Sequence, residues 1–398
     1  MNGEAIRRDT AAGWKAWRVT RHSFTPAPCL SPARWRALPP AERAAWELAR
    51  AATHANLPLL GTPMSRAVDH LLSGRIRQNA FKARPATRAG VMVSGGGYQG
   101  KTETVCEIAA VFEDSWRALH ATNPDAVPGA RDLWVPVAYV QTPVTAKPKS
   151  TCKAILDFYG APNKNMDLPE LIRQVADSLD DHGTKVLILD DITRLRMHRV
   201  DDQDTLDLIR AFMSMHVTLV LVGVDIPGSG LLNEGRTLAT GQTARRPVNG
   251  WEPTQTQRRF DLVELDRFRY DSPDQITAWT SHLAGVENHL RLLNTRPGFL
   301  TDGTMPEYLY ARTDGVVGLL ERLIEDGCTR AITTGAETLT PTLLDELPLT
   351  LAGATGRHQE AGEIPTVPTT PQPASRTGRG HRNGAFDDTG TPPIGATA

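Results

Sequence analysis

Short apolar runs alternate with segments of helical spacing through the middle of the chain. Apolar runs that predict strands occupy residues 90–93, 135–140, 186–189, 217–222 and 260–265. Helical spacing is seen between them, at residues 101–120, 150–159, 167–180 and 203–215. Because apolar strands that alternate with helices are typical of α/β domains, we predict a parallel sheet with helices packed on both faces.

The segments on either side of this region have a different pattern. Residues 1–88 predict a helical N-terminal region, with helices over Ala41–Ala55 and Pro63–Ile76. The α/β core domain is predicted at residues 89–268. A small all-helical domain is predicted to follow at 269–348, with helices near 272–294, 303–312, 316–333 and 340–346. Residues 349–398 are rich in Gly, Pro, Thr, Ser and Ala, so they bury too little apolar area to offset their ordering entropy, and we predict a disordered tail.

The net charge of -1 conceals an uneven distribution. Residues 1–90 hold 15 Lys and Arg against 5 Asp and Glu, a local net charge of +10, and the remainder holds 29 against 40, a net charge of -11. A basic arm on an acidic body favours either a polyanion or an acidic partner for the arm. An Arg-rich surface that faces only water is the equally acceptable alternative.

Composition excludes several classes of protein. No run approaches about 18 apolar residues, which excludes a membrane-spanning helix. The first eight residues lack the apolar segment of a signal peptide, so we expect a cytoplasmic protein. The four cysteines (Cys29, Cys106, Cys152 and Cys328) show no metal-ligand spacing, and we interpret them as buried or idle thiols in a reducing compartment.

The strongest motif is a glycine-rich segment placed between the first predicted strand and a predicted helix. Its residues fit the pattern G-x-x-x-x-G-K-[ST]: Gly95, Gly96, Gly97, Tyr98, Gln99, Gly100, Lys101 and Thr102. Glycines allow the backbone N–H groups to surround a phosphate, and the head of the following helix, at Glu103, adds unpaired N–H groups and a positive dipole end. Lys101 would contact the β- and γ-phosphates of ATP, and the Thr102 hydroxyl would coordinate Mg²⁺.

A second motif lies 89 residues after Lys101, where the run Val186–Leu189 ends in Asp190 and Asp191. Ligands in open α/β sheets bind at the carboxyl ends of strands, which is where these two acids are predicted to lie. We predict that Asp190 holds Mg²⁺ through water and that Asp191 orients or polarises the attacking water. Because Asp is one methylene shorter than the Glu more usual at this place, we expect slow turnover.

Together, the phosphate loop, the Asp-Asp strand and the helical second domain resemble an AAA+ P-loop NTPase. Within that superfamily the chain is similar to TniB-like transposition ATPases, relatives of IstB, MuB and TnsC, over roughly residues 45–348. Five further segments carry this resemblance: His54–Pro58 with Thr62 and Pro63, which is similar to actinobacterial members, Pro136–Pro162, Val217–Leu232, Gln257–Phe260 and Arg312–Thr340.

The resemblance implies further roles. Arg259 or its neighbour Arg258 would be an arginine finger that reaches the γ-phosphate bound by a neighbouring subunit. Asp225 would lie in the sensor-one region and contact the nucleotide. At the sensor-two position stands Gly318 in place of an Arg, and Arg322, one turn further on, is more simply a solvated helix charge.

The family also implies partners: a homo-oligomeric ring or filament, duplex DNA bound with little sequence specificity, and a DDE-type transposase. Phosphate contacts by Lys and Arg would make such binding sensitive to salt. Three basic stretches are candidates besides the N-terminal arm: Arg194, Arg196, His198 and Arg199; Arg236, Arg245 and Arg246; and Lys147 with Lys149. Two alternatives stay open: an NTPase switch in signalling or defence without a DNA role, and an ATPase that resembles a helicase loader.

Overall fold

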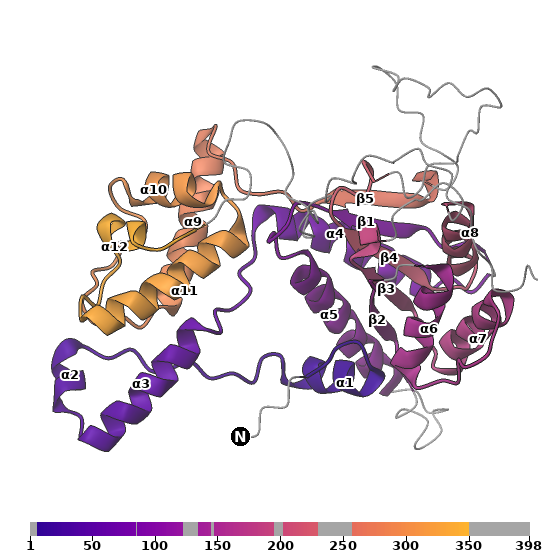
Figure 1. The fold of residues 1–398 in the computed structure, drawn as a ribbon, viewed down its shortest axis with the longest axis horizontal. Coiled ribbons are helices and arrows are strands. Elements are labelled where there is room, and N and C mark those ends of the chain that lie inside the picture. Colours follow the sequence, from indigo (N-terminus) through magenta and orange to yellow (C-terminus); the bar gives the residue numbers. More distant parts are fainter. Residues whose placement is uncertain are drawn as a thin grey trace, which may run out of the picture. The chain divides into compact units, whose positions relative to one another are not determined.

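The computed structural model describes residues 6–84, 86–121, 134–144, 147–194, 202–229 and 257–349 (Figure 1). Residues 350–398, for which the sequence predicts a disordered tail, lie outside this range. Within it, no helix is both long enough and apolar enough to cross a bilayer.

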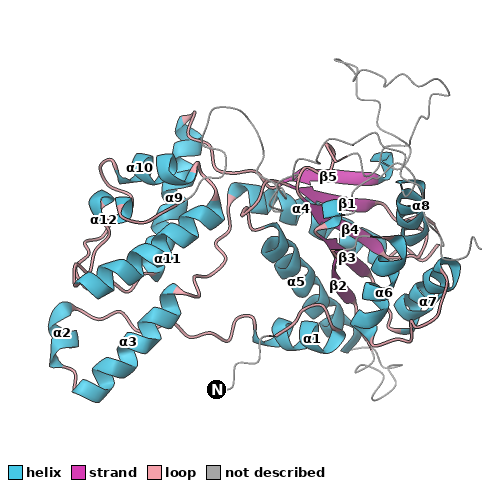
Figure 2. Ribbon diagram, viewed as in Figure 1, coloured by secondary structure: helices cyan, strands magenta, loops and turns pink. Residues whose placement is uncertain are grey.

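Five parallel strands form one sheet, in the order β2-β3-β4-β1-β5 (Figure 2). Their bounds agree closely with the five predicted apolar runs: β1 (Gly90–Ser94), β2 (Val137–Gln141), β3 (Val186–Asp190), β4 (Thr218–Gly223) and β5 (Phe260–Glu264). Val, Ile and Leu dominate the inner strands because both faces of a parallel sheet are covered by helices. The predicted sheet is therefore confirmed.

Strand register brings the ends of the strands to one edge. Gln141 of β2 is paired with Asp190 of β3, and Ser94 of β1 is paired with Gly223 of β4. The segment that follows each of these strands therefore begins at the same edge of the sheet. This edge is the place where the two predicted nucleotide motifs meet.

Helices cover the two faces of the sheet (Figure 1). Two lie on one side and three on the other: α4 (Pro63–Ala80) and α5 (Lys101–Ala121), and then α6 (Pro148–Tyr159), α7 (Leu168–Asp181) and α8 (Asp202–Met213). Their apolar sides join the strands in one continuous buried core. Local signals set their ends: Asp167 and Glu170 form a capping box at the start of α7, and Gly160 adopts a left-handed φ of 68° after α6.

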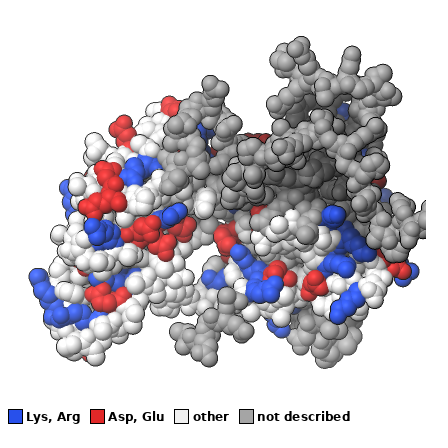
Figure 3. Space-filling view, viewed as in Figure 1, with Lys and Arg blue, Asp and Glu red and all other residues white. Residues whose placement is uncertain are grey.

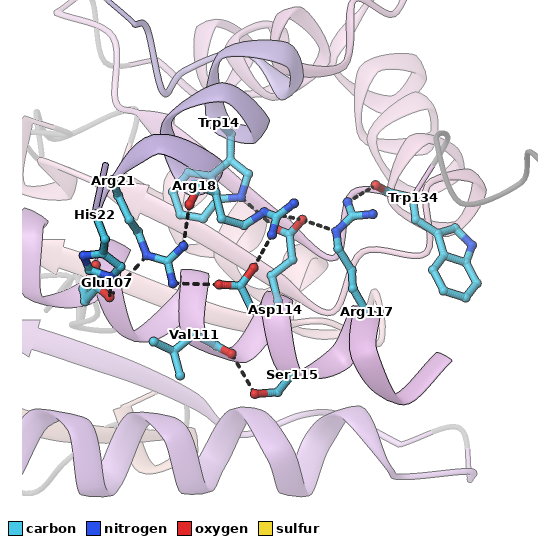
Figure 4. A network of polar contacts seen from close by, with 11 residues as sticks. Trp14, Arg18, Arg21, His22, Glu107, Val111, Asp114, Ser115, Arg117 and Trp134 are labelled. Carbon is cyan, nitrogen blue, oxygen red and sulfur yellow. Dashed lines mark hydrogen bonds and ion pairs between the residues drawn. The ribbon is translucent and has the colours of Figure 1, made fainter. Parts of the chain in front are cut away.

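Helix α1 (Ala11–Thr20), which the sequence does not predict as a separate element, packs on α5 (Figure 4). Trp14 is 1% exposed, and its indole N–H donates to the carboxylate of Glu113 at 2.7 Å. Arg18 forms ion pairs with Glu113 and Asp114, and Arg21 pairs with Asp114 at 2.7 Å. The acidic partner expected for the basic arm is therefore, for these arginines, a helix of the same chain.

This pairing changes the interpretation of the charge asymmetry. The side chains of Arg18 and Arg21 are only 10% and 12% exposed, and their ion pairs attach α1 to α5. On the face drawn in Figure 3, the visible basic and acidic side chains are interspersed. These two arginines are thus not part of a free cationic surface, whereas Arg34, Arg36 and Arg66 of the same region are exposed.

A second core joins the C-terminal helices, confirming the predicted helical character of this part. These are α9 (Pro273–His289), α10 (Met305–Thr313), α11 (Val317–Thr334) and α12 (Pro341–Asp345), and they bury Trp279, Leu309, Ile324 and Leu344 among other residues. The first of them ends before the predicted residue 294, because Leu290 has an extended backbone and its N–H bonds to the carbonyl of Glu287.

The remaining N-terminal helices are α2 (Pro32–Ala37) and α3 (Pro40–His54). Helix α3 contacts α11 of the C-terminal group. Arg50 of α3 is 2% exposed and forms a bidentate ion pair with Glu337, at 2.9 and 3.0 Å. The imidazole Nε2 of His54 accepts the backbone N–H of Arg291 at 2.8 Å. Residues 6–84 therefore contribute to two places: α1 packs with the sheet domain, and α3 packs with the helical one.

Candidate functional site

The phosphate-loop motif connects β1 directly to α5, as its sequence context predicts. Tyr98 and Gly100 have left-handed φ angles of 58° and 77°, which turn the backbone sharply before the helix begins at Lys101. A Cβ on Gly95 would lie 2.2 Å from the carbonyl oxygen of Leu265, so only glycine fits against the end of β5. Gly96 and Gly97 complete the turn, both partly exposed.

Lys101 lies at the head of α5 and lines an open pocket. The pocket has a volume of about 320 Å³ and is formed by Tyr98, Gln99, Gly100, Lys101, Thr102 and Glu103. Lys101 is 6% exposed, and its ammonium group donates to the carbonyl of Gly96 at 2.6 Å. The first N–H groups of a 21-residue helix and one ammonium group therefore meet at one pocket, which is the arrangement that binds phosphate.

The structure brings the two nucleotide motifs together. The Thr102 hydroxyl donates to Asp190 Oδ2 at 2.7 Å, although the two residues are 88 positions apart. Asp190 is 3% exposed, and burial raises its pKa, an effect that the hydroxyl groups of Thr102 and Tyr139 oppose. A carboxylate and a hydroxyl side by side are hard oxygen ligands, which fit Mg²⁺.

Asp191 follows Asp190 at the edge of the sheet, with a left-handed φ of 53°. Asp adopts this conformation more readily than most residues. Its Oδ2 accepts a hydrogen bond from Gln141 Nε2 at 3.0 Å, so the last residue of β2 orients it. The side chain is only partly buried, and water can reach the carboxylate that the sequence predicts to act on water.

Glu103 and Asp225 were predicted to contact the nucleotide, and both carboxylates already have partners. Glu103 forms a bidentate ion pair with Arg8, at 2.6 and 2.9 Å. Asp225 accepts the backbone N–H of Gly228 at 3.0 Å within its own turn. That turn is tied to β1 by the N–H of Ile226, which donates to Ser94 Oγ at 3.2 Å. Glu103 also lines the pocket at the head of α5, and the nucleotide contacts of both residues stay a prediction.

Arg258 and Arg259 lie at the opposite edge of the sheet. They form a single 3₁₀ turn before β5, and Phe260 is paired with Gly90 at the amino end of β1. The phosphate loop begins after the carboxyl end of β1, about 13 Å further along the strand. Both side chains are exposed. Neither arginine can therefore serve the phosphate loop of its own chain.

The helical domain contacts the phosphate loop through its longest helix. The backbone N–H of Gly318, in the first turn of α11, donates to the carbonyl of Tyr98 at 2.8 Å. Arg322, one turn further on, is 58% exposed and lies 3.7 Å from Asp326, as a solvated helix charge would. At the sensor-two position, the backbone of α11 therefore contacts the backbone of the phosphate loop directly.

Replacing Gly318 by Ala should disturb this contact. A Cβ there would lie 2.7 Å from the Tyr98 oxygen and 3.1 Å from its Cβ, so the helix must shift. We expect a loss of roughly 1–3 kcal/mol in stability and weaker ATP binding, measured by thermal unfolding and by titration with a fluorescent ATP analogue. Gly74→Ala, in α4, is the matched control because its Cβ would meet open space. Unchanged stability and affinity for Gly318→Ala would show that the close approach is not needed.

Next to this contact lies a small apolar cavity. Its wall is formed by Leu57, Pro58, Leu59, Leu60, Val286, Val317 and Leu320, with His282, His289 and Glu321 as polar members. Burial lowers the pKa of His282 to about 4, so its imidazole is neutral at physiological pH. Its Nδ1 is buried and has no hydrogen-bond partner among the described residues.

The predicted DNA-binding residues are only partly within the described range. Arg196, His198, Arg199, Arg236, Arg245 and Arg246 lie outside it, as does the side chain of Arg194. Lys147 and Lys149 are described, and both are exposed at the start of α6, next to the edge of the sheet that carries the nucleotide motifs.

Two residues at this site were not predicted from the sequence. Tyr139, on β2, donates its hydroxyl to Asp190 Oδ2 at 2.8 Å. Arg8 reaches the head of α5 from the segment before α1. The first could be suspected from a polar aromatic residue inside an apolar strand, whereas nothing in the spacing of Arg8 indicates a partner 95 residues away.

Comparison with known proteins agrees with this description. Residues 68–227 match the model of a family described as bacterial TniB protein. No match is found among curated protein sequences. The Aeropyrum pernix ORC1 protein, solved in complex with DNA, is similar over 75% of this chain and 68% of its own, with 13% identity and a TM-score of 0.52. Cdc6p from Pyrobaculum aerophilum is similar over 73% of this chain and 68% of its own, with 13% identity and a TM-score of 0.46.

Similarity at such low identity shows the fold alone, and that fold is the AAA+ type which the sequence resemblance implied. The matched family stretch contains β1 to β4 and both nucleotide motifs. The resemblance to TniB-like proteins is therefore confirmed.

Proposed function

We propose that this chain, whose residues 68–227 belong to the TniB family, is a transposition ATPase that binds duplex DNA when it holds ATP and presents that DNA to a DDE-type transposase. The family match and the fold together imply a transposition-associated AAA+ ATPase. Hydrolysis of ATP would then disassemble or reset the complex. Such a protein acts where the DNA is, in the cytoplasm.

The observation that carries the proposal is the contact between Thr102 and Asp190 at the mouth of the phosphate-loop pocket. Lys101 and the first N–H groups of α5 would bind the β- and γ-phosphates of ATP. Thr102 and Asp190 would hold Mg²⁺, which neutralises charge on the phosphates when it is bound. Asp191, oriented by Gln141, would accept hydrogen bonds from the attacking water and polarise it.

The position of the arginine pair supports assembly into a homo-oligomer. Arg258 and Arg259 stand about 13 Å of strand away from their own phosphate loop, so a γ-phosphate contact requires a second copy of the chain. In such a contact, one of these arginines would stabilise the charge that develops in phosphoryl transfer.

For DNA, the described residues offer two candidates: the basic N-terminal arm, with Arg34, Arg36 and Arg66 exposed, and the exposed pair Lys147 and Lys149. Contacts with phosphates read no bases, which agrees with an expectation of low sequence specificity. They would also weaken steeply as salt rises, because each neutralised phosphate releases counterions.

The test is the binding of a labelled duplex, measured by fluorescence anisotropy with ATP, with ADP and without nucleotide at matched salt. We expect the wild-type chain to bind the duplex tightly with ATP and weakly with ADP or without nucleotide. The Lys101→Ala variant should bind the duplex weakly under all three conditions. A Lys101→Ala variant that binds DNA as well as the wild type would contradict ATP-dependent loading. Absence of DNA binding with any nucleotide would favour a switch that acts on protein partners.

A further inference from the structure

The carboxylate of Asp190 is held by three described donors. Its Oδ2 accepts the hydroxyl groups of Thr102 and Tyr139, at 2.7 and 2.8 Å, and its Oδ1 accepts the backbone N–H of Asp191 at 2.9 Å. A Thr102 hydroxyl that coordinates a metal ion through an oxygen lone pair can still donate its proton to this carboxylate. Tyr139 is then the second side-chain donor that keeps Asp190 in place, and it is the one that has no metal to bind.

Tyr139 is itself rigidly placed. It is 6% exposed on β2, where it is paired with Ile188 of the neighbouring strand β3. A phenol hydroxyl is a donor at neutral pH, as the hydrogen bond to Asp190 requires. The ring stacks with Trp14 of α1, with a centroid separation of 6.3 Å and an interplanar angle of 14°.

Arg8 also contacts Tyr139. The centre of its guanidinium group lies 5.6 Å from the Tyr139 ring centroid and 5.1 Å from that of Trp17. Two of its N–H groups bond to the carboxylate of Glu103, the residue directly after Thr102. Such a bidentate pair fixes direction as well as distance. The Arg8 side chain is 20% exposed and the Glu103 side chain is 52% exposed, so water reaches the pair from the Glu103 side.

We propose that Tyr139 is a positioning residue for Asp190, and that Arg8, docked on Glu103, holds Tyr139 in position. The N-terminal segment then becomes part of the nucleotide site, because Arg8, Tyr139 and Asp190 form one continuous series of contacts. This inference rests on the proposed function, since its readout is the binding of Mg²⁺ together with ATP. Docking of the N-terminal segment would accordingly tune how well the site uses Mg²⁺.

The experiment measures the affinity of the full chain for a fluorescent ATP analogue in Mg²⁺ and in EDTA. The readout is the ratio of the affinity in Mg²⁺ to the affinity in EDTA. Tyr139→Phe removes one oxygen and keeps the ring, so packing against Trp14 is retained. We expect this ratio to fall on the order of tenfold, because a hydrogen bond to a charged acceptor is lost, while the affinity in EDTA stays unchanged. Arg8→Gln should lower the ratio in the same direction by roughly two- to fivefold, since Arg8 acts on Asp190 only through its contact with the Tyr139 ring.

Each variant has a matched control in the same chain. Tyr159→Phe removes a phenol that contacts Thr184 at 2.7 Å, away from Asp190. Arg7→Gln removes an exposed guanidinium that pairs only locally, with Asp9. Both controls should keep the wild-type ratio, and thermal unfolding checks that all four variants are folded.

The outcomes separate this inference from the proposed function. A wild-type ratio for Tyr139→Phe would overturn the positioning role, and a lowered ratio for Tyr139→Phe with a wild-type ratio for Arg8→Gln would overturn the part played by the N-terminal segment. A fall in both affinities of Tyr139→Phe by the same factor would also overturn it, because that is the signature of a purely structural residue. If the wild type itself does not bind the ATP analogue, the proposed function fails, and the inference fails with it.

Discussion

Lys101→Ala should bind ATP on the order of a hundredfold more weakly than the wild-type chain, since charge-assisted hydrogen bonds to phosphates contribute about 1.5–3 kcal/mol each. Lys101 is the only side chain of the pocket lining that is cationic, and it lies in the first turn of α5. In the structure its ammonium group rests on the Gly96 carbonyl, within the loop that would surround the phosphates. The lysine is thus already placed at the site of binding.

The measurement is titration with a fluorescent ATP analogue, repeated with ADP. The matched control is Lys82→Ala, an exposed lysine whose ammonium group donates to Asn79 Oδ1 at 3.2 Å. This control should bind ATP like the wild type. Equal ATP affinity for Lys101→Ala and Lys82→Ala would show that Lys101 and its loop do not bind the phosphates of ATP.

Asp191→Asn should abolish most ATP turnover while leaving ATP binding intact. Removing a group that polarises the attacking water costs about 10²- to 10⁴-fold in rate. Asn is close to Asp in size and adopts a left-handed φ readily, so the backbone at φ 53° should be preserved. The loss is therefore chemical, and affinity for the nucleotide should change little.

Turnover is measured as phosphate release at saturating ATP, and affinity is measured separately with the fluorescent analogue. Asp181→Asn, an exposed acid at the end of α7, is the matched control. If Asp191→Asn hydrolyses ATP as fast as this control, the attacking water is activated elsewhere, and Asp191 only caps the end of β3.

The strands and the nucleotide motifs could be predicted because both are local in sequence. Each strand of the sheet is a short apolar run, and Gly95 to Thr102 carries its own structural context. That Asp190 follows a buried strand fixed which edge of the sheet it would occupy. Both residues were predicted to hold Mg²⁺, and in the structure their side chains are hydrogen-bonded to one another, while their metal role stays a prediction.

The features that were missed depend on pairing between distant residues. Helix α1 has one fully buried tryptophan, and its arginine, Arg18, is buried as well, so its hydrophobic pattern alone is weak. Its place became clear only with Glu113 and Asp114 of α5, which neutralise Arg18 and Arg21. A count of charges along the sequence cannot show this, because it does not distinguish arginines that are paired with distant acids from arginines that are free.

Tyr139 and Glu103 show the same limit of local patterns. The sequence places Tyr139 in a strand, yet only the register of β2 against β3 brings its hydroxyl to Asp190. Glu103 stands in the first turn of a phosphate-binding helix, but its carboxylate pairs with Arg8. The roles of both side chains are set by neighbours that sequence spacing does not reveal.

The most direct test of the central claim is ATP turnover by the purified chain, with and without duplex DNA, at low and moderate salt. A DNA-loading ATPase should hydrolyse ATP faster when the duplex is present, and this stimulation should fade as salt rises, because contacts with phosphates are screened and counterions compete. Turnover that is the same with and without DNA at both salt concentrations would contradict the DNA role, leaving an ATPase that acts on protein partners.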